Sequence, residues 1–300
     1  MLEQHKQERR FKQSKQWIVV TDLDGSLLDH HDYQWNAAKP VLSALQTNHI
    51  PVIFNTSKTQ AESLQLQHQM FGLAYPHPMI VENGGAVVIP NGGILPAGIK
   101  TFGPANREMK PYLSQLQTRF QFSPITDMTL QEVVTQTGLD EERAQQARQR
   151  SYTEPIVWLD TNDQLEAFKT ELNQHQLTLI KGGRFFHVLG SFDKGLALQW
   201  LTEQYAGVLD APPKVLALGD GNNDVPMLEV ADYSVLIKSP INPWPELSAS
   251  LASRVIKTEA VGPQGWAEAV EQWLATVIVN TTSVKTTCVK TESVKTSGCD

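Results

Sequence analysis

Carboxylates gather at two places in the sequence where a short apolar run ends. The run "WIVVT" leads into Asp22 and Asp24, and the run "KVLAL" leads towards Asp220 and Asp224. Residues two apart on an extended chain point to the same side, so Asp22 and Asp24 can face one reaction centre. Carboxylates are costly to bury without partners, which indicates that these pairs serve chemistry at strand ends. Asp29 has no comparable position and is expected to be a solvated or hinge residue.

A cation would explain why two acidic loops converge. Four carboxylates brought together from two strand ends repel one another and raise each other's pKa values unless a cation holds them. A small number of hard oxygen ligands suits Mg²⁺, which keeps several waters and binds through one or two carboxylates plus substrate phosphate. A solvated Asp-rich turn is the alternative interpretation of either loop alone. Together, the two loops predict a Mg²⁺ site.

Groups that could bind an anion follow other expected elements. Thr56, Ser57 and Lys58 come after "VIFN" and lead into a helix N-terminus, whose free amides and dipole favour anions. Lys194, in "DKG", stands at another helix start. Ordinary capping and a solvated lysine are the simpler interpretations of each group alone. Beside the acidic loops, these residues indicate a phosphate site.

Apolar runs alternate with amphipathic segments at both ends of the chain, which predicts βα units and a parallel sheet. Thr59 and Glu62 form a capping-box pattern, Gly72 is a helix stop, and Pro226 opens a short helix. We expect strands at 17–21, 50–57, 78–83, 214–218 and 233–237, and helices at 39–49 and 58–72.

The middle of the chain differs in character, with long polar helices that finish in "LTLIKGGRFFHVLG", a hairpin signal around Gly182 and Gly183. We therefore expect an α/β fold in which a cap is inserted into a Rossmann-like parallel-sheet core. The expected parts are a flexible polar leader at 1–16, the core at 17–90 and 191–277, an α+β cap at 91–190, and a disordered tail of Val-Lys-Thr repeats at 280–300.

Composition narrows the class of protein. A formal net charge of -7 over 300 residues offers no basic surface for nucleic acid, and no apolar run approaches the roughly 20 residues of a membrane-spanning helix. The two cysteines, Cys288 and Cys299, lie near the end of the chain and cannot organise the fold. We expect a cytoplasmic protein with a small-molecule partner, while the oligomeric state stays open.

Four motifs carry a resemblance to a known family. "DLDGSLL", "NTSK", the lysine of "DKG" and "GDGNND" resemble, in this order, the motifs of the haloacid dehalogenase (HAD) superfamily phosphatases. Ser26 stands where many members carry threonine. The resemblance covers the core and implies the HAD fold with a C2-type cap. It also implies a Mg²⁺-dependent reaction through an aspartyl phosphate.

The resemblance implies a role for each motif residue. Asp22 would be the nucleophile, and Asp24 would protonate the leaving group and later activate water. The implied Mg²⁺ ligands are Asp22, the Asp24 carbonyl and Asp220, with Asp224 supporting them. The implied phosphate-binding residues are Thr56, Ser57 and Lys194.

Asp24 also separates activities within the superfamily. Dehalogenases lack an acid two residues after the nucleophile because halide leaves unaided, and the ion-pumping ATPases need a membrane domain. Phosphoryl transfer is therefore favoured, and transfer to a sugar hydroxyl by a phosphotransferase or mutase stays open. A phosphosugar-binding regulatory protein is the non-enzyme alternative, although binding alone does not require Asp24.

The cap contributes "RQRSYTEP" and "KGGRFFHV", which bring Arg148, Arg150, Lys181, Arg184 and His187 towards the core. Arginine forks suit carboxylate and phosphate. A solvated helix face for Arg148 and Arg150, and a packed structural role for His187, are the alternatives.

These cap motifs, together with "TSKT" and "ENGG", resemble the mannosyl-3-phosphoglycerate phosphatases, with Thr153 in place of a serine. This resemblance implies a hexosyl glycerate substrate that carries one phosphate and one carboxylate. A phosphatase for glucosyl-3-phosphoglycerate, or for another sugar phosphate such as sucrose or trehalose phosphate, remains the alternative. The implied substrate-binding residues are Lys58, Glu82, Asn83, Gly84, Arg148, Arg150, Arg184 and His187.

Overall fold

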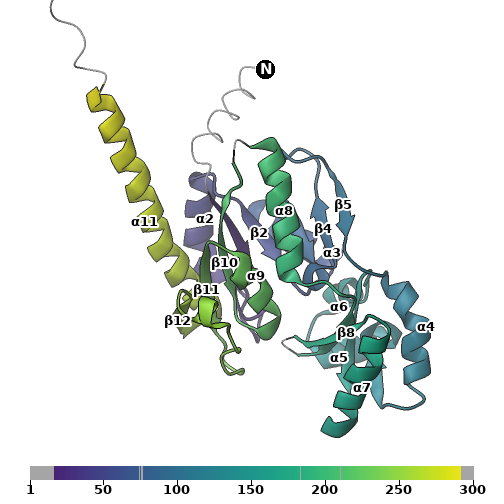
Figure 1. Cartoon of the computed structure of the whole chain (residues 1–300). Helices are drawn as coiled ribbons and strands as arrows, with labels where there is room; N and C mark the ends of the chain where they lie inside the picture. The colour runs from purple at the N-terminus through teal and green to yellow at the C-terminus, as the bar shows by residue number, and fades with distance from the viewer. Residues whose placement is uncertain (1–16, 74, 76, 183, 210, 292–300) are drawn as a thin grey trace, which may run out of the picture.

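Two β-sheets organise the computed structural model, which describes residues 17–73, 75, 77–182, 184–209 and 211–291 (Figure 1). The eight-stranded sheet has the order β12-β11-β10-β1-β2-β3-β4-β5, and the four-stranded sheet has the order β6-β7-β9-β8. We call the larger sheet with its helices the core, and the smaller sheet with its helices the cap. The leader expected at 1–16 lies outside the described residues.

The core sheet is mainly parallel, as expected for the α/β class. Its strands run parallel from β12 to β3, and β4 and β5 continue the sheet antiparallel. Its strands are β1 (Trp17–Thr21), β2 (Val52–Asn55), β3 (Met79–Val81), β4 (Ala86–Ile89), β5 (Gly98–Thr101), β10 (Lys214–Gly219), β11 (Tyr233–Lys238) and β12 (Ile256–Val261).

Helices cover both faces of the core sheet because the side chains of its strands alternate between two buried clusters. In β1, Val19 packs on one face with α2 and α11, while Ile18 and Val20 pack on the other face with α8 and α9. The core helices are α2 (Lys39–Thr47), α3 (Gln60–Phe71), α8 (Lys194–Val208), α9 (Val225–Val230), α10 (Ala249–Ala252) and α11 (Gly262–Thr291), with 3-10 turns η1 (Asn36–Ala38), η2 (Glu82–Gly84) and η4 (Asn222–Asp224).

The cap is an antiparallel sheet packed against helices. Phe122, Ile156 and Val188 of its sheet pack with α4 and α7, and Val133 and Ala144 mark a second cluster under α5 and α6. Its elements are α4 (Asn106–Leu116), β6 (Phe122–Pro124), η3 (Ile125–Asp127), α5 (Leu130–Thr137), α6 (Glu141–Ala147), β7 (Thr153–Trp158), α7 (Asn162–Gln174), β8 (Thr178–Lys181) and β9 (Phe186–Leu189).

Several local predictions are confirmed. Thr59 accepts a hydrogen bond from the Glu62 amide, and the Glu62 carboxylate accepts one from the Thr59 amide, which forms the expected capping box of α3. Gly72 is the C-cap of this helix. The expected hairpin pairs β8 with β9 in antiparallel register.

Two segments differ from expectation. The range expected to form the cap begins at residue 91, yet β5 pairs with β4 at the edge of the core sheet, because its backbone groups complete the ladder of an antiparallel neighbour. We expected disorder from residue 280, yet α11 continues to Thr291, since extending a packed helix costs less than starting one. Residues 292–300 lie outside the described part.

None of the helices in the described ranges combines the length and the apolar character needed to span a lipid bilayer.

Candidate active site

The order of the core strands brings the two acidic loops together. β1 and β10 are parallel neighbours, with Thr21 opposite Leu218, so the loops that follow them leave the same edge of the sheet. Carboxylate oxygens of Asp22, Asp220 and Asp224 lie within 4.8 Å of one another. The carboxyl ends of parallel strands are the usual ligand-binding edge of such sheets.

Lys194 is fully buried at the start of α8 and joins this acidic cluster. Its ammonium lies 2.5 Å from Asp22 Oδ1 and 2.6 Å from Asp224 Oδ1. Burial alone would lower the pKa of Lys194, but the two carboxylates raise it above its ordinary value, so Lys194 is charged. One ammonium contacts two of the three clustered carboxylates, which leaves an excess of negative charge.

Together with burial, this excess of negative charge raises the pKa values of two of the carboxyl groups. Burial raises the pKa of Asp22 to about 7, with repulsion from Asp224 adding to the shift and Lys194 opposing it. Burial, followed by the charges of Asp224 and Asp22, also raises the pKa of Asp220 well above its ordinary value. A divalent cation would relieve the repulsion that causes part of these shifts.

The residues present therefore fit Mg²⁺, but their carboxylate oxygens differ in whether they already have partners in the protein. Both oxygens of Asp224 have protein partners: Oδ1 faces Lys194, and Oδ2 accepts from the amides of Asp220 and Gly221 at 2.9 Å. Asp22 and Asp220 would thus supply the side-chain oxygens to the metal. Gly25, at φ 83°, is required beside them because a Cβ there would lie 2.6 Å from Asp220 Oδ2.

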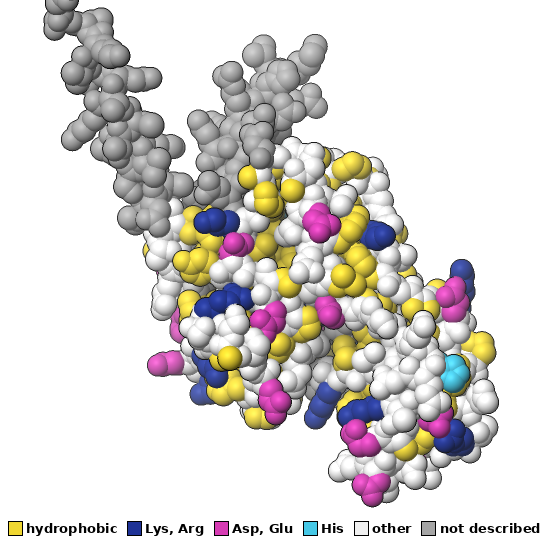
Figure 2. Space-filling model, viewed as in Figure 1, with side chains coloured by type: hydrophobic (Ala, Val, Ile, Leu, Met, Phe, Trp, Pro, Cys, Tyr) yellow, Lys and Arg dark blue, Asp and Glu magenta, His cyan; other side chains and the backbone are white. Residues whose placement is uncertain are grey.

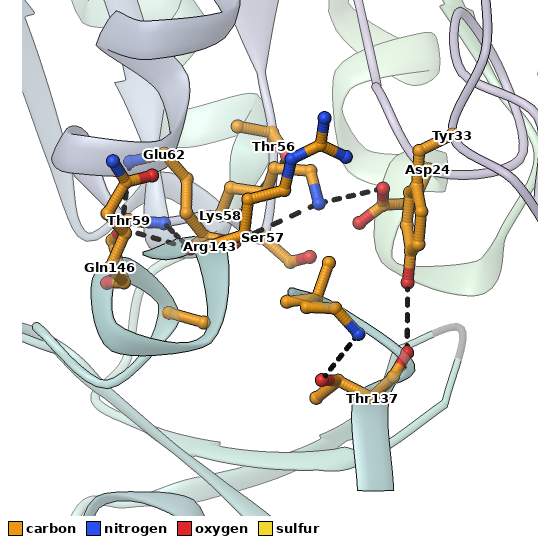
Figure 3. A network of polar contacts seen from close by, with 12 residues as sticks. Asp24, Tyr33, Thr56, Ser57, Lys58, Thr59, Glu62, Thr137, Arg143 and Gln146 are labelled. Atoms are coloured by element: carbon orange, nitrogen blue, oxygen red, sulfur yellow. Dashed lines mark hydrogen bonds and ion pairs between the residues drawn. The ribbon is translucent and has the colours of Figure 1, made fainter. Parts of the chain in front are cut away.

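Asp24 faces a second polar network, drawn in Figure 3. Its Oδ1 lies 2.8 Å from the ammonium of Lys58, which also lies 3.9 Å from Glu62 Oε1 and 5.1 Å from the centre of the Tyr33 ring. Burial lowers the pKa of Lys58, but the charges of Asp24 and Glu62 more than offset this and raise it overall. The side chain of Asp24 remains 32% exposed, so it can still meet a ligand.

Thr56 and Ser57 lie at the end of β2, as expected. Thr56 is fully buried, and its Oγ1 accepts a hydrogen bond from the Lys58 amide at 3.1 Å. Ser57 lines the cavity that contains the carboxylates, and its carbonyl accepts a 2.6 Å hydrogen bond from Arg150 of the cap.

A cavity of about 490 Å³ lies where the cap meets the core. On the face shown in Figure 2, basic side chains lie at this junction. The residues of our predicted site that line the cavity are Asp22, Asp24, Ser57, Lys58, Arg150, Arg184, His187 and Asp220, with Lys181 beside them.

Arg184 and His187 of the cap line this cavity but differ in their partners. Arg184 donates to the Thr137 carbonyl of the cap and, at 3.0 Å, to the His30 carbonyl of the core. His187 is buried, and burial lowers its pKa to about 3, with the charges of Arg150 and Lys194 acting in the same direction. Among the described residues, His187 Nδ1 has no hydrogen-bond partner.

Four predicted substrate residues do not line this cavity: Glu82, Asn83, Gly84 and Arg148. The Glu82 carboxylate accepts hydrogen bonds from the amides of residues 151–153 and from the Thr153 hydroxyl, so it ties the cap to the core. Asn83 accepts a 3.1 Å hydrogen bond from Asn223, which does line the cavity. Their substrate roles stay predictions.

Sequence reasoning missed several lining residues, among them Tyr33 and the loop at 242–246. The loop had a local signal, because "NPWPE" places Trp244 between two prolines in a polar surrounding. Tyr33 had no local signal in the sequence. Its ring contacts Lys58 and Arg184, which come from other segments of the chain, so its place in the cavity wall depends on the assembled fold.

Solved structures share this architecture. A Thermoplasma acidophilum protein matches with a TM-score of 0.62 at 15% identity, covering 85% of this chain and 96% of its own. A haloacid dehalogenase-like hydrolase from Bacteroides thetaiotaomicron matches with a TM-score of 0.62 at 17% identity, covering 86% and 99%. A sucrose-phosphatase from Synechocystis, solved with sucrose and phosphate, matches with a TM-score of 0.56 at 16% identity, covering 86% and 97%.

The family model for haloacid dehalogenase-like hydrolases matches residues 19–243, a segment that contains the acidic cluster, Lys194 and the whole cap. The motif residues occupy one site at the carboxyl edge of the core sheet. The match extends over more than half of the chain, and this chain belongs to the family of haloacid dehalogenase-like hydrolases.

Proposed function

We propose that this hydrolase is a Mg²⁺-dependent phosphatase that converts mannosyl-3-phosphoglycerate to mannosylglycerate and phosphate. The observation that carries the proposal is the grouping of Asp22 and Asp220 on the wall of a cavity that also holds Asp24 and its partner Lys58, with the ammonium of the buried Lys194 2.5 Å from Asp22. A nucleophile, a cation beside it and a second acid two residues later are the groups that phosphoryl transfer requires.

Asp22 would attack the phosphorus atom and form an aspartyl phosphate while the bond to the leaving oxygen breaks. Asp24 would give its proton to that oxygen, and then take a proton from the water that attacks the aspartyl phosphate, which releases inorganic phosphate and restores Asp22. Bound Mg²⁺ would supply positive charge to the phosphoryl oxygens, held by Asp22, the Asp24 carbonyl and Asp220 with Asp224 in support.

Lys194 has a double role in this proposal. Its ammonium holds Asp22 in place and favours the ionised carboxylate that attacks. Thr56 and Ser57, at the end of β2, would bind the phosphoryl oxygens together with Lys194.

The substrate specificity is supported by the cationic cap wall. Arg150, Lys181 and Arg184 line the cavity beyond the phosphate-binding residues, and a substrate with a carboxylate in addition to its phosphate would use this charge. His187 would meet the substrate as a neutral imidazole. The cavity lining does not include Glu82, Asn83, Gly84 or Arg148, and their contribution to substrate binding is part of the proposal.

The cytoplasmic location expected from composition stays a prediction.

A phosphate-release assay across a panel of esters tests the proposal. The panel contains mannosyl-3-phosphoglycerate, glucosyl-3-phosphoglycerate, sucrose phosphate, trehalose phosphate and unglycosylated 3-phosphoglycerate, each with Mg²⁺ and with EDTA. We expect kcat/KM for the mannosyl ester to exceed that for the others by at least about 10-fold, with activity lost in EDTA.

The assay also separates the alternatives. Comparable rates on all esters would refute the substrate assignment, and a preference for another ester would replace it. Binding without release of phosphate would favour a regulatory protein. Transfer of the phosphoryl group to a sugar, detected by product analysis, would favour a phosphotransferase or mutase.

A further inference from the structure

A loop of the core between β11 and α10 forms part of the cavity wall. Residues 242–246, "NPWPE", line the same cavity as Asp22 and Asp24. Pro243 and Pro245 restrict the backbone on both sides of Trp244, because each proline has a fixed φ and disfavours a helical conformation in the residue before it. The indole is therefore held on a stiff segment.

Trp244 differs from the other two large aromatic side chains of the cavity. The Tyr33 ring already has the cations of Lys58 and Arg184 within 5.5 Å of its centre, and Phe185 packs against the second cluster of the cap. Trp244 belongs to none of the hydrophobic clusters in the described part of the chain, and 39% of it is exposed. An indole that lines a cavity and keeps this much of its surface open is available for contact with a ligand, since ligand cavities are commonly lined by aromatic side chains.

One side of the indole has a partner. The ammonium of Lys257, on β12, lies over the Trp244 ring at 5.1 Å from its centre. This contact helps to fix the ring.

The cap and the core contribute different kinds of side chain to the cavity wall. Cap residues supply positive charge through Arg150, Lys181 and Arg184, which suits anionic groups. The core loops that line the cavity with Trp244 supply the side-chain amides of Asn222, Asn223 and Asn242, together with the carboxylate of Glu246. Amides both donate and accept hydrogen bonds, which suits the hydroxyl groups of a neutral sugar.

We infer that Trp244 is a specificity-determining residue whose indole stacks against the apolar C–H face of the hexose ring of the substrate. The inference rests on the proposed function and adds a subsite for the sugar. The amide side chains of the neighbouring loops would bind the hydroxyl groups at the edge of the ring.

Kinetics of Trp244→Ala on two esters test the inference. Mannosyl-3-phosphoglycerate and 3-phosphoglycerate share the phosphate and the carboxylate and differ in the sugar. We expect the variant to raise KM about 5-fold for the mannosyl ester and to leave KM for 3-phosphoglycerate within about 2-fold. Trp244→Phe should recover most of the loss, because it keeps an aromatic face.

Ile241→Ala is the matched control, since Ile241 lies in the same loop, is 51% exposed and does not line the cavity. It should match the wild type on both esters. Equal effects of Trp244→Ala on both esters, or no effect on either, would overturn the inference and assign Trp244 to general loop structure.

A titration without turnover separates this inference from the proposed function. Failure of the wild type to hydrolyse the mannosyl ester refutes the proposed function. Calorimetric titration of the Mg²⁺-containing enzyme with mannosylglycerate, which keeps the sugar and the carboxylate but lacks the phosphate, then measures binding without turnover. Binding that weakens about 5-fold in Trp244→Ala supports the inference, whereas equal dissociation constants, or no binding by the wild type, overturn it.

Discussion

The ammonium of Lys58 lies 2.8 Å from Asp24 Oδ1 and connects the proposed acid to Glu62, 3.9 Å away on the first turn of α3 (Figure 3). Glu62 in turn caps this helix through Thr59, whose hydroxyl also lies 3.1 Å from the carbonyl of Gln146 in the cap. The acid is thus held by a network that reaches both parts of the molecule.

Replacing Lys58 by methionine should lower kcat for phosphate release about 10- to 100-fold, because Asp24 loses the cation that positions it. The free energy of unfolding should fall by about 1–2 kcal/mol, since the buried Glu62 loses its nearby positive charge. Steady-state kinetics and urea unfolding measure the two effects. Lys169→Met is the control, because this exposed lysine pairs with Glu166 far from the site. A wild-type kcat in Lys58→Met would show that the ion pair does not serve the reaction.

Asp22→Asn should lower phosphate release at least about 10³-fold, because an amide cannot act as the nucleophile. It should also reduce the rise in melting temperature that Mg²⁺ produces, since one of the three clustered carboxylates is removed. Asp29→Asn is the control, because the Asp29 side chain accepts hydrogen bonds from the amides of His31 and Asp32 and is outside the clustered carboxylates. It should keep the activity and the Mg²⁺ response. Activity that survives in Asp22→Asn would refute the covalent mechanism.

Arg184→Ala should raise KM about 5-fold and increase hydrogen exchange at residues 30–33, because Arg184 joins the cap to the core through the His30 carbonyl. Arg119→Ala, which removes an exposed pair with Glu171 inside the cap, should change neither quantity. Arg184→Lys separates two roles of this residue. Lysine keeps the charge but cannot donate to two carbonyls in the fork geometry of arginine, so recovery of KM by lysine would favour a charge contact with substrate instead.

The core of the site could be predicted because its geometry follows from local patterns. Asp22 and Asp220 each follow an apolar strand, and parallel strands end at a common edge of the sheet. The contribution of Lys194 required the family motif, since a lysine at a helix start is ordinarily solvated. Its full burial between Asp22 and Asp224 appears only in the assembled fold.

The cap contacts could not be predicted in the same way. Arg184 and His30 are 154 residues apart, and their hydrogen bond depends on how the cap lies against the core. Glu82 was expected to bind substrate, and in the structure its carboxylate accepts hydrogen bonds from the amides of residues 151–153. The amides that Glu82 binds belong to a segment about 70 residues away, and unlike the local capping box of Thr59 and Glu62 such a long-range bond to the backbone has no fixed sequence spacing.

His187→Gln tests the neutral state of the buried imidazole through the pH dependence of stability. The pKa of His187 is lowered to about 3 in the folded protein, against 6.5 for an unperturbed histidine, first by burial and then by Arg150 and Lys194. Between these two values the unfolded chain binds more protons than the folded one, so stability falls as the pH is lowered, by up to about 1.4 kcal/mol per pH unit for one proton. His187→Gln removes this proton uptake and should flatten the decline in the free energy of unfolding between pH 6.5 and 4, measured by urea unfolding at several pH values.

His77, whose pKa burial lowers to about 4, contributes equally to both proteins and cancels in the comparison. The exposed His175, replaced by glutamine, should follow the wild type. Parallel curves for wild type and His187→Gln would show that the imidazole is accessible to protons in the folded state.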